Sequence, residues 1–225
     1  MHRVVARAFA LLLFFGVTLS SSSATALSFQ VDFRQSSYQV VGGDTFDDLM
    51  LEHASGSLIS SNILQAAEGI SSSVYAGNIS GDYSLLISTD IVVAAGGTFE
   101  LQIGTDWGRG GGGRVVNNDN SNVLYDYVTT DDIWWANNWN HADVISTGPM
   151  VLTAGSSYTL AWVGFEGCCA GSATIRYSYN GGAFQTLEES TFDPLIVPAP
   201  EPGTALLLGL GLLLMSLGRR HLHRR

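Results

Sequence analysis

The two cysteines of this 225-residue chain are adjacent, at Cys168 and Cys169, and they are the first residues whose spacing suggests chemistry. Adjacent α-carbons lie about 3.8 Å apart, below the window of about 4.4–6.8 Å that most disulfides occupy. A vicinal disulfide here would therefore be a strained ring that locks its turn. We predict this bond, with a free pair or an intermolecular bridge as the alternatives. No Lys or His lies close in sequence to lower a thiol pKa, so we do not expect a redox enzyme.

Residues Gly167–Gly171 also match G-x-C-x-G, the pattern of a nucleophile elbow. Such an elbow stands between a strand and a helix, whereas the next segment, Ala173–Tyr179, alternates like a strand. Between the two terminal segments the histidines are His53 and His141, and the sequence contains no H-E-x-x-H pattern. We therefore predict that the protein is not an enzyme.

Hard oxygen ligands, which calcium prefers, gather in two predicted loops. Asp119 lies in the run Asn117–Asn122, and the pair Asp131 and Asp132 follows about ten residues later. The first run matches only the start of the D-x-[DN]-x-[DN]-G calcium loop, and Asp and Asn also build turns without a metal. We carry Asp119, Asp131 and Asp132 forward as candidate calcium ligands and predict no other cofactor. A hydrolase acting through Asp131 and Asp132 is an alternative with no motif behind it.

A group of aromatic and polar side chains forms a candidate glycan-binding set: Trp107, Trp134, Trp135, Trp139, Asn138 and His141. Exposed tryptophan faces stack on sugar rings, and asparagine side chains hydrogen-bond to hydroxyls. The alternative is that the rings fill a hydrophobic core, as we expect for Trp162. Because successive residues of a strand point to opposite faces, we expect one of Trp134 and Trp135 to face outward.

Strands must position these residues, since the apolar pattern in the middle of the chain mostly has a period of two. Alternation is clearest in 29–33, 99–103, 158–163 and 173–179, and further strands are predicted at 83–87, 113–116 and 149–152. One short helix is expected at residues 45–52, with Asp44 as its cap. Many short strands separated by glycine turns predict an all-β fold, a single β-sandwich or jelly-roll domain.

The distribution of charge and apolar residues excludes one class of partner. Hydrophobic residues make up 46% of the chain and charged residues 13%, and the apolar excess lies at the two ends, in Phe9–Leu19 and Leu206–Leu217. Residues 27–200 contain 19 acids and four arginines, which gives them a net charge of −15. With no basic stripe to neutralise phosphates, we expect no nucleic-acid partner.

The first 26 residues have the order of a secretory signal peptide. Arg3 and Arg7 form the positive region, Ala8–Leu19 is an apolar run too short to span a bilayer, and Ala24 and Ala26 form an A-x-A site. We predict export through the Sec translocon and cleavage by signal peptidase after Ala26. An uncleaved anchor is the alternative.

The C-terminus contains three parts in a fixed order. Val197–Pro202 is a stiff, proline-rich segment. Gly203–Gly218 carries no charge and would reach about 24 Å as a helix, slightly short of a hydrocarbon core of roughly 30 Å. Arg219–Arg225 is a basic cluster, which the positive-inside rule keeps in the cytoplasm. The tail therefore predicts a single inner-membrane anchor, with the helix at 204–217.

This tripartite tail resembles the PEP-CTERM sorting signal of Gram-negative bacteria. The resemblance assigns the sorting role to Pro200, Glu201, Pro202, Arg219, Arg220, Arg224 and Arg225. It implies recognition by an exosortase in the inner membrane, cleavage near Pro-Glu-Pro, and release to the cell surface or the extracellular biofilm matrix. An ordinary single-span anchor is the alternative. We divide the chain into a signal peptide (1–26), an exported β-sandwich (27–189), a proline-containing linker (190–199) and a sorting signal (200–225).

The stretch Gly97–Ala183 is similar to the lectin-type sandwich of anthrax protective antigen and yeast flocculins. The matching segments are Phe99–Ile103, Asp106–Gly108, Arg114–Asn117, Val151–Tyr158, Trp162–Glu166 and Ala173–Tyr179. In adhesin members, two consecutive aspartates near the position of Asp106 hold calcium, and here Trp107 stands in the second place. The segment Cys168–Gly171 also resembles a PEP-CTERM group named for its Cys-Cys-x-Gly motif.

These observations favour a non-enzymatic protein of the cell surface or the exopolysaccharide matrix. The alternative is a lectin-like carbohydrate-binding module, dependent on calcium if the aspartates are ligands. In either case exopolysaccharide is the expected partner outside the cell.

Overall fold

The computed structural model describes residues 27–79, 81–169 and 171–197. The predicted signal peptide, the Pro-Glu-Pro segment, the membrane helix at 204–217 and the terminal arginines lie outside these residues. Within the described ranges, no helix combines the length and the apolar character needed to cross a membrane.

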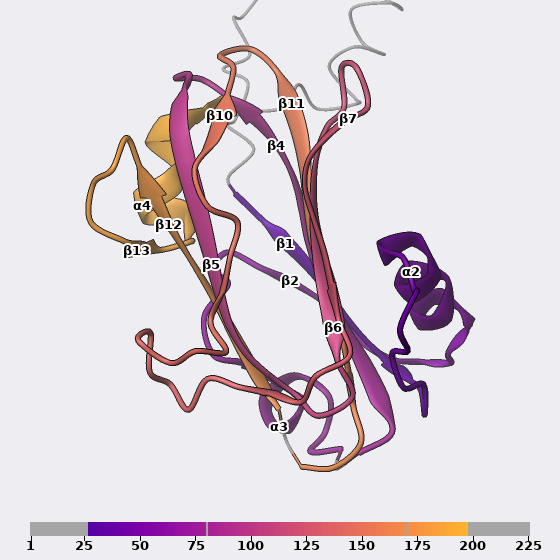
Figure 1. Ribbon diagram of the computed structural model, residues 1–225. Helices are drawn as coiled ribbons and strands as arrows, with labels where there is room; N and C mark the ends of the chain where they lie inside the picture. The colour runs from indigo at the N-terminus through magenta and orange to yellow at the C-terminus, as the bar shows by residue number, and fades with distance from the viewer. Residues whose placement is uncertain (1–26, 80, 170, 198–225) are drawn as a thin grey trace, which may run out of the picture. The chain divides into compact units, whose positions relative to one another are not determined.

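The described chain folds into two antiparallel β-sheets (Figure 1). The first sheet has the order β2 (Leu58–Leu64), β1 (Phe29–Gln35), β4 (Tyr83–Val93), β11 (Ser157–Glu166), β6 (Gly111–Asn117) and β7 (Asn122–Thr129), with β14 (Ile196–Val197) also paired to β4. The second has the order β10 (Met150–Leu152), β5 (Gly97–Trp107), β12 (Ser172–Tyr179) and β13 (Gln185–Thr186). Three short strands flank it: β3 (Ile70–Ser71) pairs with β12, while β8 (Ile133–Trp134) and β9 (Ile145–Ser146) pair with β5.

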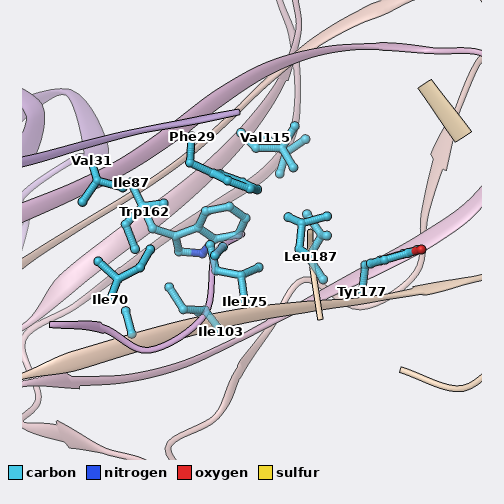
Figure 2. Close-up of a cluster of buried hydrophobic side chains, with 14 of the residues drawn as sticks. Phe29, Val31, Ile70, Ile87, Ile103, Val115, Trp162, Ile175, Tyr177 and Leu187 are labelled. Carbon is cyan, nitrogen blue, oxygen red and sulfur yellow. The ribbon is translucent and has the colours of Figure 1, made fainter. Parts of the chain in front are cut away.

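The hydrophobic core lies between the two sheets. Every second residue of a strand faces inward, so Phe29, Ile87 and Trp162 from the first sheet meet Ile103 and Ile175 from the second (Figure 2). Each of these side chains is at most 1% exposed. The expectation of a β-sandwich is thus confirmed for the described residues, and so is the core position of Trp162.

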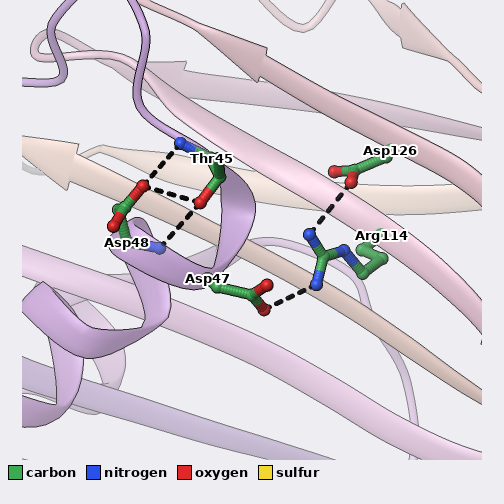
Figure 3. A network of polar contacts seen from close by, with 5 residues as sticks. All are labelled: Thr45, Asp47, Asp48, Arg114 and Asp126. Carbon is green, nitrogen blue, oxygen red and sulfur yellow. Dashed lines mark hydrogen bonds and ion pairs between the residues drawn. The ribbon is translucent and has the colours of Figure 1, made fainter.

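Helix α2 (Phe46–Ser55) packs on the outer face of the first sheet, where Phe46 and Leu49 are buried. The expected cap, Asp44, is wrong by one residue. Thr45 is the N-cap: its hydroxyl accepts from the backbone N–H of Asp48, and the Asp48 carboxylate accepts from the N–H of Thr45 (Figure 3). This reciprocal arrangement satisfies two N–H groups that the first helical turn leaves free. Asp44 instead accepts from the N–H of Val41.

The sandwich also includes most of the predicted linker, which corrects the boundary placed at residue 189. Helix α3 (Ser72–Tyr75) follows β3, and near the end of the described chain α4 (Glu189–Phe192) leads into the 3₁₀ helix η1 (Asp193–Leu195). Phe192 is 1% exposed and stacks edge-on against Tyr177. Strand β14 then pairs with Val92 and Val93 of β4. The apolar side chains of this segment are therefore part of the core, and the folded domain continues to Val197.

Candidate functional site

The connection from β7 to β10 carries most of the predicted aromatic set. Strand β8 within it pairs with the end of β5, with Trp134 opposite Asp106. The two adjacent tryptophans point in opposite directions: Trp134 is 59% exposed, whereas Trp135 is 5% exposed. The expectation that one of the pair faces outward is confirmed.

Trp135 is seated on the outer face of the second sheet. Leu101 and Ile103 of β5 face the core, so the alternate residues Gln102 and Gly104 face outward. A methyl group at Gly104 would overlap the ring of Trp135. The absence of a side chain at Gly104 therefore creates the space in which Trp135 lies.

Trp139 and Arg176 extend this packing along the sheet. The rings of Trp135 and Trp139 have centroids 4.6 Å apart and are tilted by 56°. The guanidinium carbon of Arg176, on β12, lies 4.1 Å from the ring centre of Trp139 and 4.5 Å from that of Phe184. Cation–π attraction operates at these distances. The result is a row of three aromatic rings with one cation between the second and the third.

Gln102 fixes the direction of the guanidinium. It stands opposite Arg176 in the β5–β12 pairing, and its Oε1 accepts from Arg176 Nε at 2.9 Å and from Nη2 at 2.7 Å. Burial lowers the pKa of Arg176, but the ordinary value for arginine is so high that the side chain remains charged.

A groove of about 360 Å³ opens beside this row. We call it the aromatic groove. It is lined by Trp135, Trp139, Arg176 and Phe184, together with Glu68, Gly69, Asn137, Thr174, Gln185 and Thr186. Sequence reasoning did not assign Arg176, Phe184 or Gln102 to a site, because only the pairing of β5 with β12 brings them to the tryptophans.

The other predicted glycan residues of this loop lie apart from the groove lining. Trp134 and His141 form an edge-on pair with centroids 6.2 Å apart. His141 Nδ1 accepts from the N–H of Asp143, whose carboxylate accepts from the N–H of Trp134. The Asn138 side chain accepts from the N–H of Asn140. These bonds hold the loop in shape and leave Trp134 facing solvent.

Trp107 contradicts the expectation that it contacts a glycan. It is 2% exposed and continues the inward-facing series of Leu101 and Ile103 on β5. Its ring occupies the space above Gly111 and Gly164, where a methyl group would overlap it. The period-two pattern of β5 already placed this ring in the core, and it is a packing residue.

The three candidate calcium ligands do not come together. Asp119 lies in the turn between β6 and β7, where its Oδ2 accepts from the N–H of Ser157. Asp131 and Asp132 follow the other end of β7, and a strand of that length spans roughly 25 Å. Among the described residues, no group of three or more His, Cys, Asp or Glu side chains is arranged to hold a metal ion. Asp119 therefore lies apart from Asp131 and Asp132, and calcium binding at either loop stays a prediction.

Near the cysteine turn, the carboxylate of Asp106 lies close enough to Glu166 and Asp132 to be affected by their charge. Burial, then Glu166, then Asp132 raise the pKa of Asp106 to about 6. Glu166 is 2% exposed and accepts from the backbone N–H groups of Gly108, Gly167 and Cys168. Its role is therefore to hold together the turns after β5 and β11.

Cys168 and Cys169 stand side by side in the turn after β11. Their α-carbons are 3.8 Å apart, and their sulfur atoms face each other. Cys169 has φ +64°, a conformation that costs a non-glycine residue energy outside a constrained turn. This arrangement is compatible with the vicinal bond, which stays a prediction.

Residues 198–225 match the family described as the PEP-CTERM protein-sorting motif. The chain carries a PEP-CTERM sorting signal. The match confirms the resemblance based on Pro200-Glu201-Pro202 and the basic tail. The PEP-CTERM signal implies export, a transient membrane anchor and an exosortase as the processing partner. No curated protein matches the sequence.

Several solved structures named for adhesin or PA14 domains are similar to this chain. The PA14 sugar-binding domain from an RTX adhesin is 12% identical, with 73% of this chain and 97% of that one covered and a TM-score of 0.45. The PA14 domain of the MpAFP antifreeze protein is 9% identical, with 77% and 91% covered and a TM-score of 0.49. The Epithelial Adhesin 9 A domain from Candida glabrata, in complex with Galβ1-3GlcNAc, is 7% identical, with 79% and 92% covered and a TM-score of 0.49.

Proposed function

We propose that the processed protein is a non-enzymatic component of the cell surface or extracellular matrix of a Gram-negative bacterium, and that it binds carbohydrate through the aromatic groove. The sorting signal supports the location. The observation that carries the binding role is the row of Trp135, Trp139 and Phe184 beside an open groove. Under this proposal, signal peptidase and exosortase remove the two ends of the chain.

The rings of the groove suit a sugar because they are held in place before a ligand arrives. Trp135 rests on Gly104 and against Trp139, and Trp139 also contacts the guanidinium of Arg176. A sugar ring has apolar C–H faces that pack on such aromatic surfaces. Little side-chain entropy is then lost on binding, because the rings are already ordered.

Polar groups around the rings complete the set that a sugar requires. Asn137 and Gln185 are exposed, and Thr174 and Thr186 are half-buried beside them. Their amide and hydroxyl groups both donate and accept, as sugar hydroxyls do. A few polar groups around an apolar surface are typical of a small-molecule site.

A glycan array with the processed protein tests this function, with and without calcium so that a metal requirement becomes visible. The Trp139→Ala variant is expected to lose the signal. Trp134→Ala is the matched control, since it removes an exposed tryptophan of the same loop that lies outside the groove lining. Binding that survives Trp139→Ala but not Trp134→Ala would reject the aromatic groove. The absence of any glycan ligand would leave a purely structural role in the matrix.

A further inference from the structure

The four arginines of the described domain have different partners. Arg109 pairs with Asp82 at 2.7 Å, and Arg114 pairs with Asp47 at 2.6 Å and Asp126 at 2.9 Å. Arg34 donates to the backbone carbonyls of Ala54 and Gly56 at the C-terminal end of α2. Within the described ranges Arg176 has no carboxylate at ion-pair distance, although the domain has 19 acids, and its hydrogen-bond partner is the neutral amide of Gln102.

The guanidinium of Arg176 contacts two aromatic rings and one side-chain amide. Trp139 and Phe184 both lie within contact distance of the guanidinium carbon. Gln102 uses the Nε hydrogen and one hydrogen of Nη2. A guanidinium has five N–H hydrogens, so three remain for a ligand. These three lie on the fork that suits a planar oxyanion such as a carboxylate.

The charges around Arg176 limit where an anion can bind in the aromatic groove. Glu100, on the same outward-facing row of β5 as Gln102, raises the pKa of Arg176 against the effect of burial. The Oε1 atom of Glu100 accepts a hydrogen bond from Ser146 Oγ, so this carboxylate points toward β9. Glu68 also lines the groove and is exposed. An anion approaching a domain of net charge −15 is generally repelled, so favourable binding must depend on local contact with Arg176.

We propose that the aromatic groove selects an acidic sugar, and that Arg176 binds the carboxylate of a uronic acid unit whose ring packs on Trp139. This inference rests on the carbohydrate-binding function proposed above and specifies its substrate class. Arg176 is then a specificity-determining residue, since neutral glycans use the rings alone. A charge-assisted hydrogen bond contributes about tenfold to hundredfold in affinity.

Titration calorimetry of the processed protein with an oligouronate tests the proposal. The comparison ligand is the same oligosaccharide after reduction of its carboxyl groups to alcohols, and EDTA is present in both titrations. We expect the acidic form to bind at least about tenfold more tightly. The difference should vanish in Arg176→Gln and shrink in Arg176→Lys, because lysine keeps the charge but lacks the planar fork. Arg34→Gln removes one positive charge from β1 and should leave the difference in affinity unchanged.

The outcomes separate this inference from the proposed function. Equal affinity for the acidic and reduced oligosaccharides, with binding of both lost in Trp139→Ala, would overturn the acidic sugar as the substrate class. The carbohydrate-binding function would stand. If Arg176→Gln also loses binding of the reduced oligosaccharide, the arginine acts by packing and does not recognise the carboxylate. Stronger binding of a sulfated neutral glycan than of the oligouronate would also overturn the carboxylate assignment. Binding of neither oligosaccharide would overturn the acidic substrate class, and the glycan array then decides whether the carbohydrate-binding function stands. Thermal unfolding of each variant checks that it is folded.

Discussion

The backbone N–H of Leu27 donates to Asp193 Oδ1 at 3.0 Å, which joins the start of the described chain to the 3₁₀ helix near its end. The Leu27 side chain is 2% exposed. If signal peptidase cleaves after Ala26, this nitrogen becomes the α-ammonium of the mature protein. The new charge would then form beside a carboxylate that is already in place.

We therefore expect mass spectrometry of the processed protein to show an N-terminus at Leu27. Asp193→Asn should lower the free energy of unfolding of this form by about 1–2 kcal/mol, since a hydrogen bond to a charged group is lost. Denaturant unfolding measures this change. Glu189→Gln is the control, because among the described residues no hydrogen bond joins this neighbouring side chain to Leu27. Equal effects of the two variants would contradict the ion pair.

His53 predicts a pH dependence of stability. It is 2% exposed on α2, with Nδ1 2.8 Å from Ser84 Oγ. Burial, and then Arg34, lower its pKa to about 4, while Asp32 acts in the opposite direction. Because the folded pKa lies below the unfolded value of about 6.5, the contribution is complete above pH 6.5 and is lost as pH falls toward 4. The loss is at most about 3 kcal/mol, and His53→Gln should remove it.

Asp106 provides an internal comparison for this measurement. Its pKa is raised to about 6 in the folded state, so the folded protein binds the proton more tightly than the unfolded chain. Stability from this group therefore rises as pH falls from about 6 toward the unfolded pKa of about 3.9. Urea unfolding between pH 4 and 7 gives the slope of the free energy of unfolding against pH. Relative to the wild type, this slope should change in opposite directions in His53→Gln and Asp106→Asn. Identical slopes in both variants would contradict the two assignments.

Gly104 predicts a link between packing and ligand binding. In Gly104→Ala the new methyl group would meet the ring of Trp135, and overpacking of this kind costs about 1–3 kcal/mol. We expect a lower melting temperature and weaker glycan binding, because the Trp135 ring must move away from the sheet. Gly42→Ala is the matched control, since its methyl group meets open space. A Gly104→Ala variant with wild-type stability and binding would show that the ring adapts at no cost.

The sorting signal predicts a defect in location. Replacement of Pro200-Glu201-Pro202 by alanines should leave the protein in the inner membrane, because exosortase no longer recognises it. Fractionation of cells followed by immunoblotting measures the distribution. Pro198→Ala, in the same segment but outside the tripeptide, should be released normally. Unchanged release of the triple-alanine variant would reject the role of these residues.

We predict that the cysteine pair is oxidised in the exported protein. With a vicinal disulfide between Cys168 and Cys169, alkylation of the unfolded protein without reductant should add no mass. The same treatment after reduction should add two alkyl groups. Intact-mass measurement distinguishes the two states, and uptake of two groups without reductant would rule out the bond.

Local pattern was sufficient for most of the long strands and for the direction of many side chains, although β2 and β7 were not predicted. The alternation along β5 places Trp107 in the core together with Leu101 and Ile103, which is the alternative to its candidate role in glycan binding. The Thr45-x-x-Asp48 pattern likewise contained the true cap of α2. In both cases the signal was local, since strand pleat and helix capping depend only on residues a few positions apart.

The sequence by itself identified the sorting signal at residues 198–225, because a sorting tail is a short linear pattern that needs no fold to be recognised. Its period-two runs also determined a β-sandwich. Only the tertiary structure decided the candidate site. Gln102 and Arg176 lie 74 residues apart and meet because β5 pairs with β12. The seat of Trp135 depends on Gly104, some thirty residues earlier. Strand register is set by the packing of the whole core, so no local pattern could have located the aromatic groove.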